Sequence, residues 1–198
     1  MWAAGGASLT GVCHDRLMGE PGHRAVVERI ADAVGWTGAV APKYGWDHVE
    51  RRLGLVFPAD YKEFMGRFPS CCFRGVLRLW NPVQNTEGLA RFTDDFGRLL
   101  DGVREGREYY PEIPAPFPAP GGVIPFADDM SGGALFWVPW TADPDGWHVT
   151  RQSASLPDDW MRTRRPMTAV LLELATSRSS RNVLRWDLSG ADRSIELF

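Results

Sequence analysis

The chain has 198 residues, of which 24% are charged and 44% hydrophobic, and its formal net charge at pH 7 is −3. This length and composition predict one globular domain with a core of its own. The slightly acidic balance argues against a nucleic-acid partner, which would need a basic face. No apolar stretch approaches the roughly 18 residues of a membrane-spanning helix, so we expect no membrane partner.

Three residue types are informative about the fold. The sequence holds nine tryptophans, 15 prolines and 21 glycines. Tryptophans are large anchors that lie either in a core or at an interface. The prolines and glycines predict many turns, and therefore a loop-rich fold rather than a helical bundle.

The first elements in chain order are an extension and two helices. Residues 1–22 are rich in Gly, Ala and Ser, and we expect a loose extension before a single domain over residues 23–198. The extension lacks a basic segment followed by an apolar run, so it does not resemble a signal peptide. Apolar spacing predicts a helix over residues 23–34 and a shorter helix over residues 46–53, which Gly54 closes.

Residues 53–68 read LGLVFPADYKEFMGRF and predict an amphipathic helix. Pro58 suits the first turn of a helix because its missing N–H would have no intrahelical partner there. Asp60 and Glu63 place negative charge near the positive end of the helix dipole. The apolar face repeats at helical spacing and consists of Tyr61, Phe64, Met65 and Phe68. The pattern predicts a core helix that carries no functional residue.

The rest of the chain mixes short strands with helices. Periodicity and turn residues predict strands over residues 73–80, 123–126, 134–138, 147–151 and 183–188, and helices over residues 88–103 and 167–175. A proline-rich segment over residues 109–122 and a polar segment over residues 157–165 are expected to be loops. The order predicts an α+β fold, with N-terminal helices and a closing C-terminal helix packed on a mixed, mostly antiparallel sheet.

The sequence offers no constellation for catalysis, for a metal or for a cofactor. It contains no G-x-S-x-G elbow and no glycine-rich phosphate loop. Its four histidines lie in unrelated contexts and are His14, His23, His48 and His148. Cys13, Cys71 and Cys72 lack metal-ligand spacing, and they favour reduced thiols in a cytoplasmic protein. We therefore expect a cytoplasmic protein that is not an enzyme and uses no metal or cofactor.

Acidic pairs are the strongest alternative to this expectation. Paired carboxylates bind cations or perform acid–base chemistry, and the pairs are Asp94–Asp95, Asp128–Asp129, Asp143 with Asp145, and Asp158–Asp159. Each pair stands beside Gly, Pro or Ser, so hydrogen bonding to a turn backbone is the favoured role. A cluster of Arg162, Arg164 and Arg165 near Trp160 would suit nucleic acid, but a solvated loop is favoured.

Residues 46–64 resemble the N-terminal signature of the SMI1/KNR4 (SUKH) superfamily, which has the form E..LG..LP.DY..F. The matching positions are Glu50, Leu53, Gly54, Pro58, Asp60, Tyr61 and Phe64. Residues 122–127 are similar to the second signature, and residues 134–137, 147–149 and 168–174 are similar to the elements that follow it. The resemblance covers residues 40–176. Pro69 to Cys72 stand where members often carry a glycine pair, and residues 129–133 replace a common Asn-Gly-Asp turn.

The resemblance implies an α+β fold and a function without catalysis. Bacterial members are associated with toxin immunity, in which each protein binds and blocks a cognate toxin that is often a nuclease, whereas fungal members are regulatory interaction proteins. We therefore expect a non-catalytic immunity protein that blocks a polymorphic toxin. The alternative is a regulatory or scaffolding module with an endogenous partner. A third hypothesis is an enzyme that uses Asp128 with Asp129, or His148.

The candidate partner-binding residues combine aromatic anchors with acidic side chains. Tryptophans dominate interface energetics, and acidic residues complement a basic partner such as a nuclease. The candidates are Trp137, Trp140, Trp147, Trp160, Asp128, Asp129, Asp143 and Asp145.

Overall fold

The computed structural model describes residues 22–156 and 158–198. The helices are α1 (His23–Ala33), α2 (Trp46–Leu53), α3 (Ala59–Arg67), α4 (Thr86–Tyr109) and α5 (Met167–Thr176), with a 3-10 turn η1 (Pro144–Gly146). The strands are β1 (Cys71–Phe73), β2 (Leu77–Leu79), β3 (Ile124–Asp129), β4 (Ala134–Val138), β5 (His148–Gln152), β6 (Trp160–Arg162) and β7 (Ile195–Leu197). Of the predicted extension only Gly22, the N-cap residue of α1, lies within the described residues.

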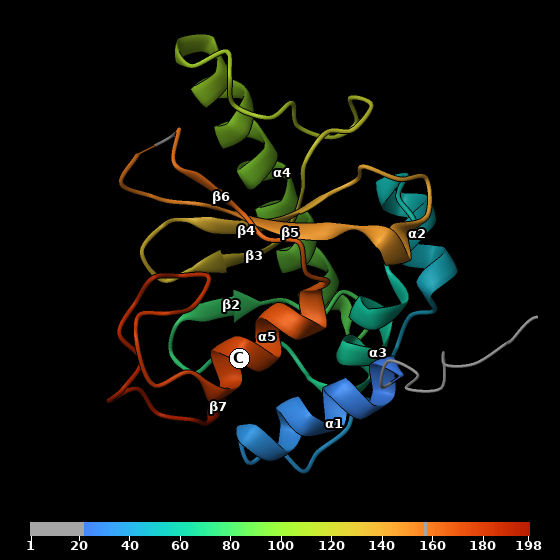
Figure 1. The fold of residues 1–198 in the computed structure, drawn as a ribbon. Coiled ribbons are helices and arrows are strands. Elements are labelled where there is room, and N and C mark those ends of the chain that lie inside the picture. The colour runs from blue at the N-terminus through green and yellow to red at the C-terminus, as the bar shows by residue number, and fades with distance from the viewer. Residues whose placement is uncertain (1–21, 157) are drawn as a thin grey trace, which may run out of the picture.

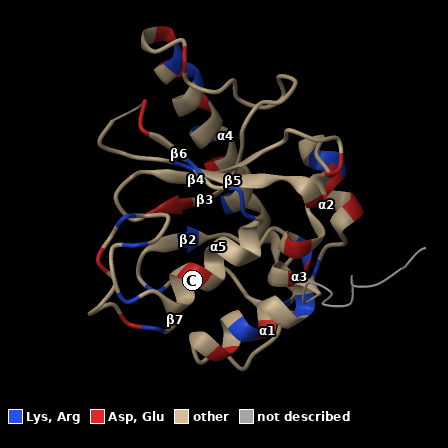
Figure 2. Ribbon diagram, viewed as in Figure 1, with Lys and Arg blue, Asp and Glu red and all other residues tan. Residues whose placement is uncertain are grey.

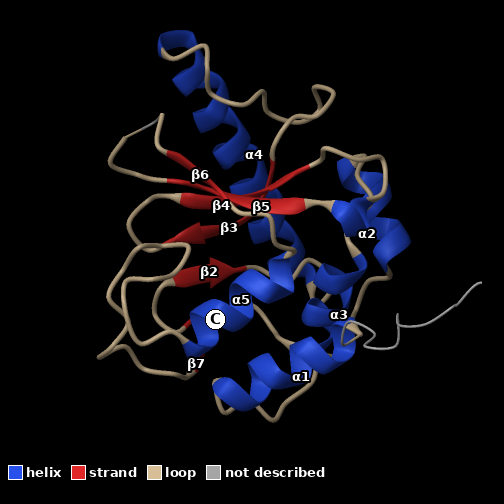
Figure 3. Ribbon diagram, in the orientation of Figure 1, coloured by secondary structure: helices blue, strands red, loops and turns tan. Residues whose placement is uncertain are grey.

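The α+β prediction is confirmed. The strands form one sheet in the order β6-β5-β4-β3-β2-β1-β7, and each of these neighbours is antiparallel, where the prediction allowed a mixed sheet. Figure 3 shows the sheet with α4 on one side and α5, with α1 and α3, on the other. In Figure 1 the far end of α4 projects beyond the sheet.

The interior strand β4 is buried on both faces because helices cover both. Leu135 and Trp137 belong to the main core, which also contains residues of α1, α3 and α5. Ala134 and Phe136 point to the opposite face, since side chains alternate along a strand, and they cluster with Val103 of α4. The run ALFWV is therefore the continuous apolar pattern of a strand covered on two sides.

The predicted aromatic helix is α3, and the residues that match the family signature hold the scaffold together. The Asp60 carboxylate accepts hydrogen bonds from the Thr168 backbone N–H (3.0 Å) and hydroxyl (3.1 Å), and so caps the start of α5. Glu50 accepts from the Phe57 N–H (2.9 Å) and pairs with Lys62 (2.6 Å). Gly54 ends α2 with a left-handed φ of 66°.

The single strand predicted over residues 73–80 is wrong, because the chain reverses within it. Arg74 and Gly75 both have left-handed φ values, 54° and 67°, and they join β1 to β2 as a hairpin. The buried Arg74 guanidinium stabilises this turn by donating to backbone carbonyls of the C-terminal segment, including Ser177 (3.0 Å) and Asp192 (3.0 Å).

The strand predicted over residues 183–188 is also wrong, and the C-terminal strand is β7. The Asn182 side chain accepts from the Leu184 N–H (3.0 Å) and donates to the Trp186 carbonyl (2.8 Å). Glu173 accepts from the Val183 N–H (3.1 Å). Side chains therefore take the backbone partners that a strand would have used. The polar segment predicted as a loop over residues 157–165 contains the edge strand β6.

Candidate functional site

The eight candidate partner-binding residues do not form one surface. Asp128, Asp129, Trp137 and Trp147 are buried, and Trp160 is half-buried. Only Trp140, Asp143 and Asp145 are exposed, and all three lie on the β4–β5 loop. The structure therefore reduces the candidate surface to this loop and its neighbours.

Trp137 is a core residue, and its assignment as a partner anchor is corrected. It is fully buried, and its ring lies edge-on to Tyr61 (centroids 5.0 Å apart) and beside Phe126 (4.6 Å). Trp147 is corrected likewise, because it packs on Trp137 (6.5 Å) and donates its Nε1–H to the Thr141 carbonyl (3.0 Å). The apolar run of β4 was the signal for a buried Trp137, since a strand with one exposed face would alternate.

Asp129 organises a turn and is not available to a partner. Its Oδ1 accepts from the Ser131 N–H (2.9 Å) and hydroxyl (2.7 Å) and from the Gly133 N–H (2.7 Å), while Oδ2 pairs with the buried Arg151 (2.9 Å). Burial raises the pKa of Asp129, but these hydrogen bonds outweigh it and lower the pKa below its ordinary value. The turn role favoured for this residue is what the geometry supports.

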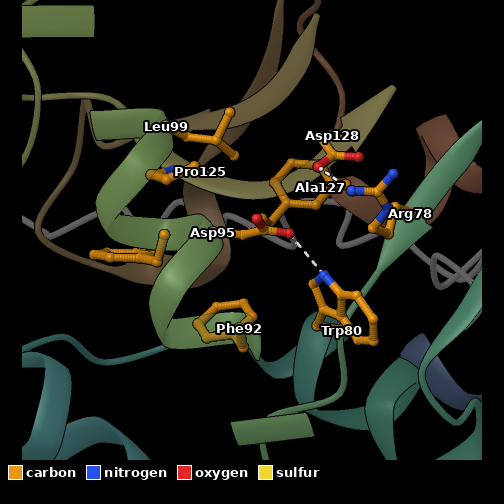
Figure 4. A pocket seen from close by; sticks show the side chains of 10 residues that line it. Arg78, Trp80, Phe92, Asp95, Leu99, Pro125, Ala127 and Asp128 are labelled. Atoms are coloured by element: carbon orange, nitrogen blue, oxygen red, sulfur yellow. Dashed lines mark hydrogen bonds and ion pairs between the residues drawn. The ribbon is translucent and has the colours of Figure 1, made fainter. Parts of the chain in front are cut away.

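Asp128 lines a narrow pocket between α4 and strands β2 and β3 (Figure 4). Its Oδ2 contacts Arg78 (3.4 Å) and Arg98 (3.1 Å), and Arg98 also pairs with Asp95 (2.9 Å). Asp95 in turn accepts the Trp80 Nε1–H at 2.7 Å. The pocket thus joins two carboxylates that the sequence placed in separate pairs.

The electrostatics of this pocket raise the pKa of Asp128 above its ordinary value. Burial raises its pKa most, the negative charge of Asp95 adds to the rise, and the cations Arg78 and Arg98 offset part of it. The Oδ1 atom of Asp128 is buried and accepts no hydrogen bond from the described residues. The cavity measures about 10 Å³, which is room for one water molecule and too small for an organic substrate.

Other reactive side chains are separated from one another. Burial, with the neighbouring Cys72 as a lesser cause, raises the pKa of the Cys71 thiol to about 12. His148 stacks on Trp140 with ring centroids 5.0 Å apart. Within residues 22–156 and 158–198, no three His, Cys, Asp or Glu side chains are grouped so that they could hold a metal ion. Over the same ranges no helix has the length and hydropathy to cross a membrane.

The β4–β5 loop presents Trp140 in a fixed position. Trp140 is 63% exposed, yet its Nε1–H donates to the Gly146 carbonyl (2.8 Å) and its ring rests on His148. The Asp143 carboxylate accepts from the Asp145 N–H (3.1 Å) and caps η1. The loop therefore holds an exposed aromatic ring in place.

Asp145 joins this loop to the helical layer, a role that sequence reasoning missed. Its Oδ1 accepts from the Ala59 N–H at 2.6 Å, at the start of α3. We predicted that Asp145 would hydrogen-bond to its own turn. Its observed partner is 86 residues away in the sequence, and no local pattern indicates a contact at that distance.

An open groove lies beside α2, on the segment that precedes the Ala59 contact. In the view of Figure 1, the β4–β5 connection and α2 lie on the same side of the molecule. The groove measures about 430 Å³, and its lining includes Asp47, Arg51 and the 56% exposed Val56. We define the Trp140 surface as Trp140, Asp143, Asp145 and His148, which lie on the β4–β5 loop or next to it.

No protein-family model, no curated protein and no solved structure matches the chain. Membership of the SMI1/KNR4 superfamily therefore stays a prediction that depends on the signature-like residues.

Proposed function

We propose that the chain is a non-catalytic protein-binding domain and that the Trp140 surface contacts its partner. The observation that carries the proposal is an exposed Trp140 ring that is fixed by the Gly146 carbonyl and by His148. Fixing an exposed aromatic side chain before binding lowers the entropy cost of association. Tryptophan is also the residue type most enriched at binding hot spots.

The chemistry of the surface suits a basic partner with an apolar patch. Asp143 and Asp145 are exposed and contribute negative charge, while the exposed Trp140 ring contributes apolar area. Complementary charge speeds association and selects partners, and apolar contact supplies affinity.

The proposal includes the absence of catalysis. It is supported by the contacts of the side chains that were the candidates for an enzyme. Asp129 is bonded to its own turn and to Arg151, and Asp128 faces a cavity of water size. His148 supports Trp140. Each of these side chains therefore has a structural task.

The narrower proposal is an immunity protein that binds and blocks a cognate toxin in the cytoplasm. Its support is the resemblance of residues 40–176 to the SMI1/KNR4 superfamily, together with scaffold roles for Glu50, Gly54 and Asp60. The free, buried thiols of Cys71 and Cys72 suit a reducing compartment. The second candidate is a regulatory or scaffolding module, and the same resemblance favours it because fungal members have that role.

Co-expression with candidate toxins from neighbouring genes tests the proposal. The wild-type chain should restore growth and co-purify with one toxin. Trp140→Ala should weaken the complex by about tenfold or more, as for a hot-spot residue. Tyr109→Ala is the matched control, because Tyr109 is 78% exposed at the far end of α4. Binding of an endogenous protein without growth rescue would support the regulatory candidate, and equal loss in both variants would overturn the proposed surface.

A further inference from the structure

A groove lined by arginines lies between the segment that follows β5 and the segment that follows α5. Its basic residues come from two stretches of the chain and are Arg162, Arg164, Arg165, Arg181 and Arg185. The groove is open and measures about 500 Å³. Figure 2 shows Lys and Arg positions recurring along the loops after α5. The fold thus adds Arg181 and Arg185 to a cluster that was only three residues in the sequence.

Most of this positive charge is not neutralised. Arg165 is held by both carboxylate oxygens of Glu173 (3.0 and 2.9 Å), and Arg185 lies 3.8 Å from Asp159. The other three arginines are exposed and form no ion pair with any residue of 22–156 or 158–198; they are Arg162, Arg164 and Arg181. The groove is therefore a positively charged region in a chain whose net charge is −3.

The two walls of the groove are fixed relative to each other. Glu173 pairs with Arg165 on one wall and accepts the Val183 N–H (3.1 Å) on the other. Asn182 bonds the carbonyls of Ser179 (2.7 Å) and Trp186 (2.8 Å). These hydrogen bonds therefore hold in place the two backbone segments that carry the unpaired guanidinium groups.

One wall is an edge strand with outward-facing backbone groups. β6 ends the sheet order, so no strand formed by residues 22–156 or 158–198 lies on its outer side. The Thr163 N–H donates inward to Val149 (2.9 Å), and Asp159 accepts from the Ser153 N–H (3.1 Å). Because alternate residues of an antiparallel ladder turn their backbone groups in opposite directions, Arg162 presents its N–H and carbonyl to the free edge.

We propose that this groove binds an extended acidic segment of a partner protein. The segment would add a strand along β6, and its carboxylates would engage Arg162, Arg164 and Arg181. Nucleic acid fits less well, because the described residues that line the groove include no aromatic side chain on which a base could stack. This inference is independent of the Trp140 surface and of any toxin.

Fluorescence anisotropy with a labelled peptide of alternating Glu and Thr tests the inference on the full chain. The peptide places every carboxylate on one face when extended. The triple variant Arg162→Gln, Arg164→Gln, Arg181→Gln should weaken binding by about tenfold or more at low salt. The control Arg24→Gln, Arg29→Gln, Arg52→Gln removes the same charge from exposed arginines elsewhere and should change it little.

Two further arms separate the outcomes. N-methylation of alternate residues of the peptide should weaken binding, because it removes backbone donors that pair with β6. A single-stranded DNA probe that binds more tightly than the peptide, with loss in the triple variant, would overturn the choice of an acidic protein segment. Equal effects in the triple variant and its control would overturn the groove itself, provided that circular dichroism shows both variants folded.

Discussion

The two ends of β4 carry similar residues and use them in opposite ways. At the first end, the β3–β4 turn buries Asp129 against Ser131, Gly133 and Arg151. At the second end, the β4–β5 loop leaves Asp143 and Trp140 exposed. An aspartate in a glycine-containing turn therefore does not by itself indicate a surface site, since its role depends on what the fold packs against it.

The reason for the difference is the crowding of the β3–β4 turn. A Cβ atom at Gly133 would lie 2.5 Å from Asp129 Oδ2 and 2.6 Å from the Gln152 carbonyl, so only glycine fits. In the β4–β5 loop, Asp145 instead reaches outward to another element, α3. The first end is closed by its own hydrogen bonds, and the second leaves side chains exposed to solvent.

The largest loss of stability should follow from removing Asp129, whose carboxylate holds the β3–β4 turn together. Asp129→Ala leaves Arg151 buried without its carboxylate and removes the acceptor of three hydrogen bonds. We expect the free energy of unfolding to fall by about 3–5 kcal/mol, measured by chemical denaturation. Asp143→Ala, at the open end, should change it by less than about 0.5 kcal/mol. Similar losses in the two variants would remove the distinction between the ends.

The contribution of Asp129 to the free energy of unfolding should also depend on pH. The folded pKa of Asp129 is below its ordinary value of 3.8, so its charge stabilises the fold above that pH, and this contribution is lost as the pH falls through the folded pKa. Asp60 and Asp128 have raised pKa values and give the opposite sign. The difference in unfolding free energy between wild type and Asp129→Asn isolates Asp129. It should shrink from neutral pH to below 3.8, and a constant difference would contradict the assignment.

A smaller effect is expected where the open end touches α3. Asp145→Ala removes the acceptor of the Ala59 N–H, which is a helix-capping contact. We expect a loss of about 1 kcal/mol in the free energy of unfolding, measured by thermal or chemical denaturation. Asp145→Asn keeps an acceptor oxygen and should recover most of the loss. If the asparagine variant is as unstable as the alanine variant, charge rather than the cap is responsible.

The smallest effect on stability should come from Trp140 itself. Its ring is mostly exposed and makes one hydrogen bond, so Trp140→Ala should cost less than about 1 kcal/mol. The same denaturation measurement on Trp147→Ala, a buried tryptophan of the same loop region, should give about 3–5 kcal/mol. A large loss for Trp140→Ala would make Trp140 a structural residue and weaken its role as a binding anchor.

The sequence predicted the elements whose signals are local. The apolar repeats of α1, α3 and α5 and the turns around β4 gave the helices and the central strands, since periodicity and turn residues are local properties. The hairpin at Arg74 was missed, because an arginine with a left-handed φ is stabilised only by carbonyls of the distant C-terminal segment. A local sequence pattern carries no information about a hydrogen-bond acceptor that lies about 100 residues further along the chain.

The candidate site was less predictable than the fold. Trp137 and Trp140 stand three residues apart, yet one is the centre of the core and the other is 63% exposed. Trp137 lies on the face of β4 that packs on Tyr61 of α3, whereas Trp140 lies beyond the end of β4 in the β4–β5 loop. This difference is set by tertiary packing. The arginine groove was likewise hidden, because Arg181 and Arg185 reach it from a segment that was predicted to be a strand.

The position of β7 has a consequence for how the protein is made. Cys71 of β1 pairs on one side with Leu79, soon after it in the chain, and on the other side with Leu197. Until the ribosome has synthesised residues 195–197, the outer edge of β1 stays open and Arg74 lacks its carbonyl partner at Asp192. The nascent chain therefore carries an unpaired strand edge from the synthesis of β1 until β7 is made, which is a period of exposure to misassembly.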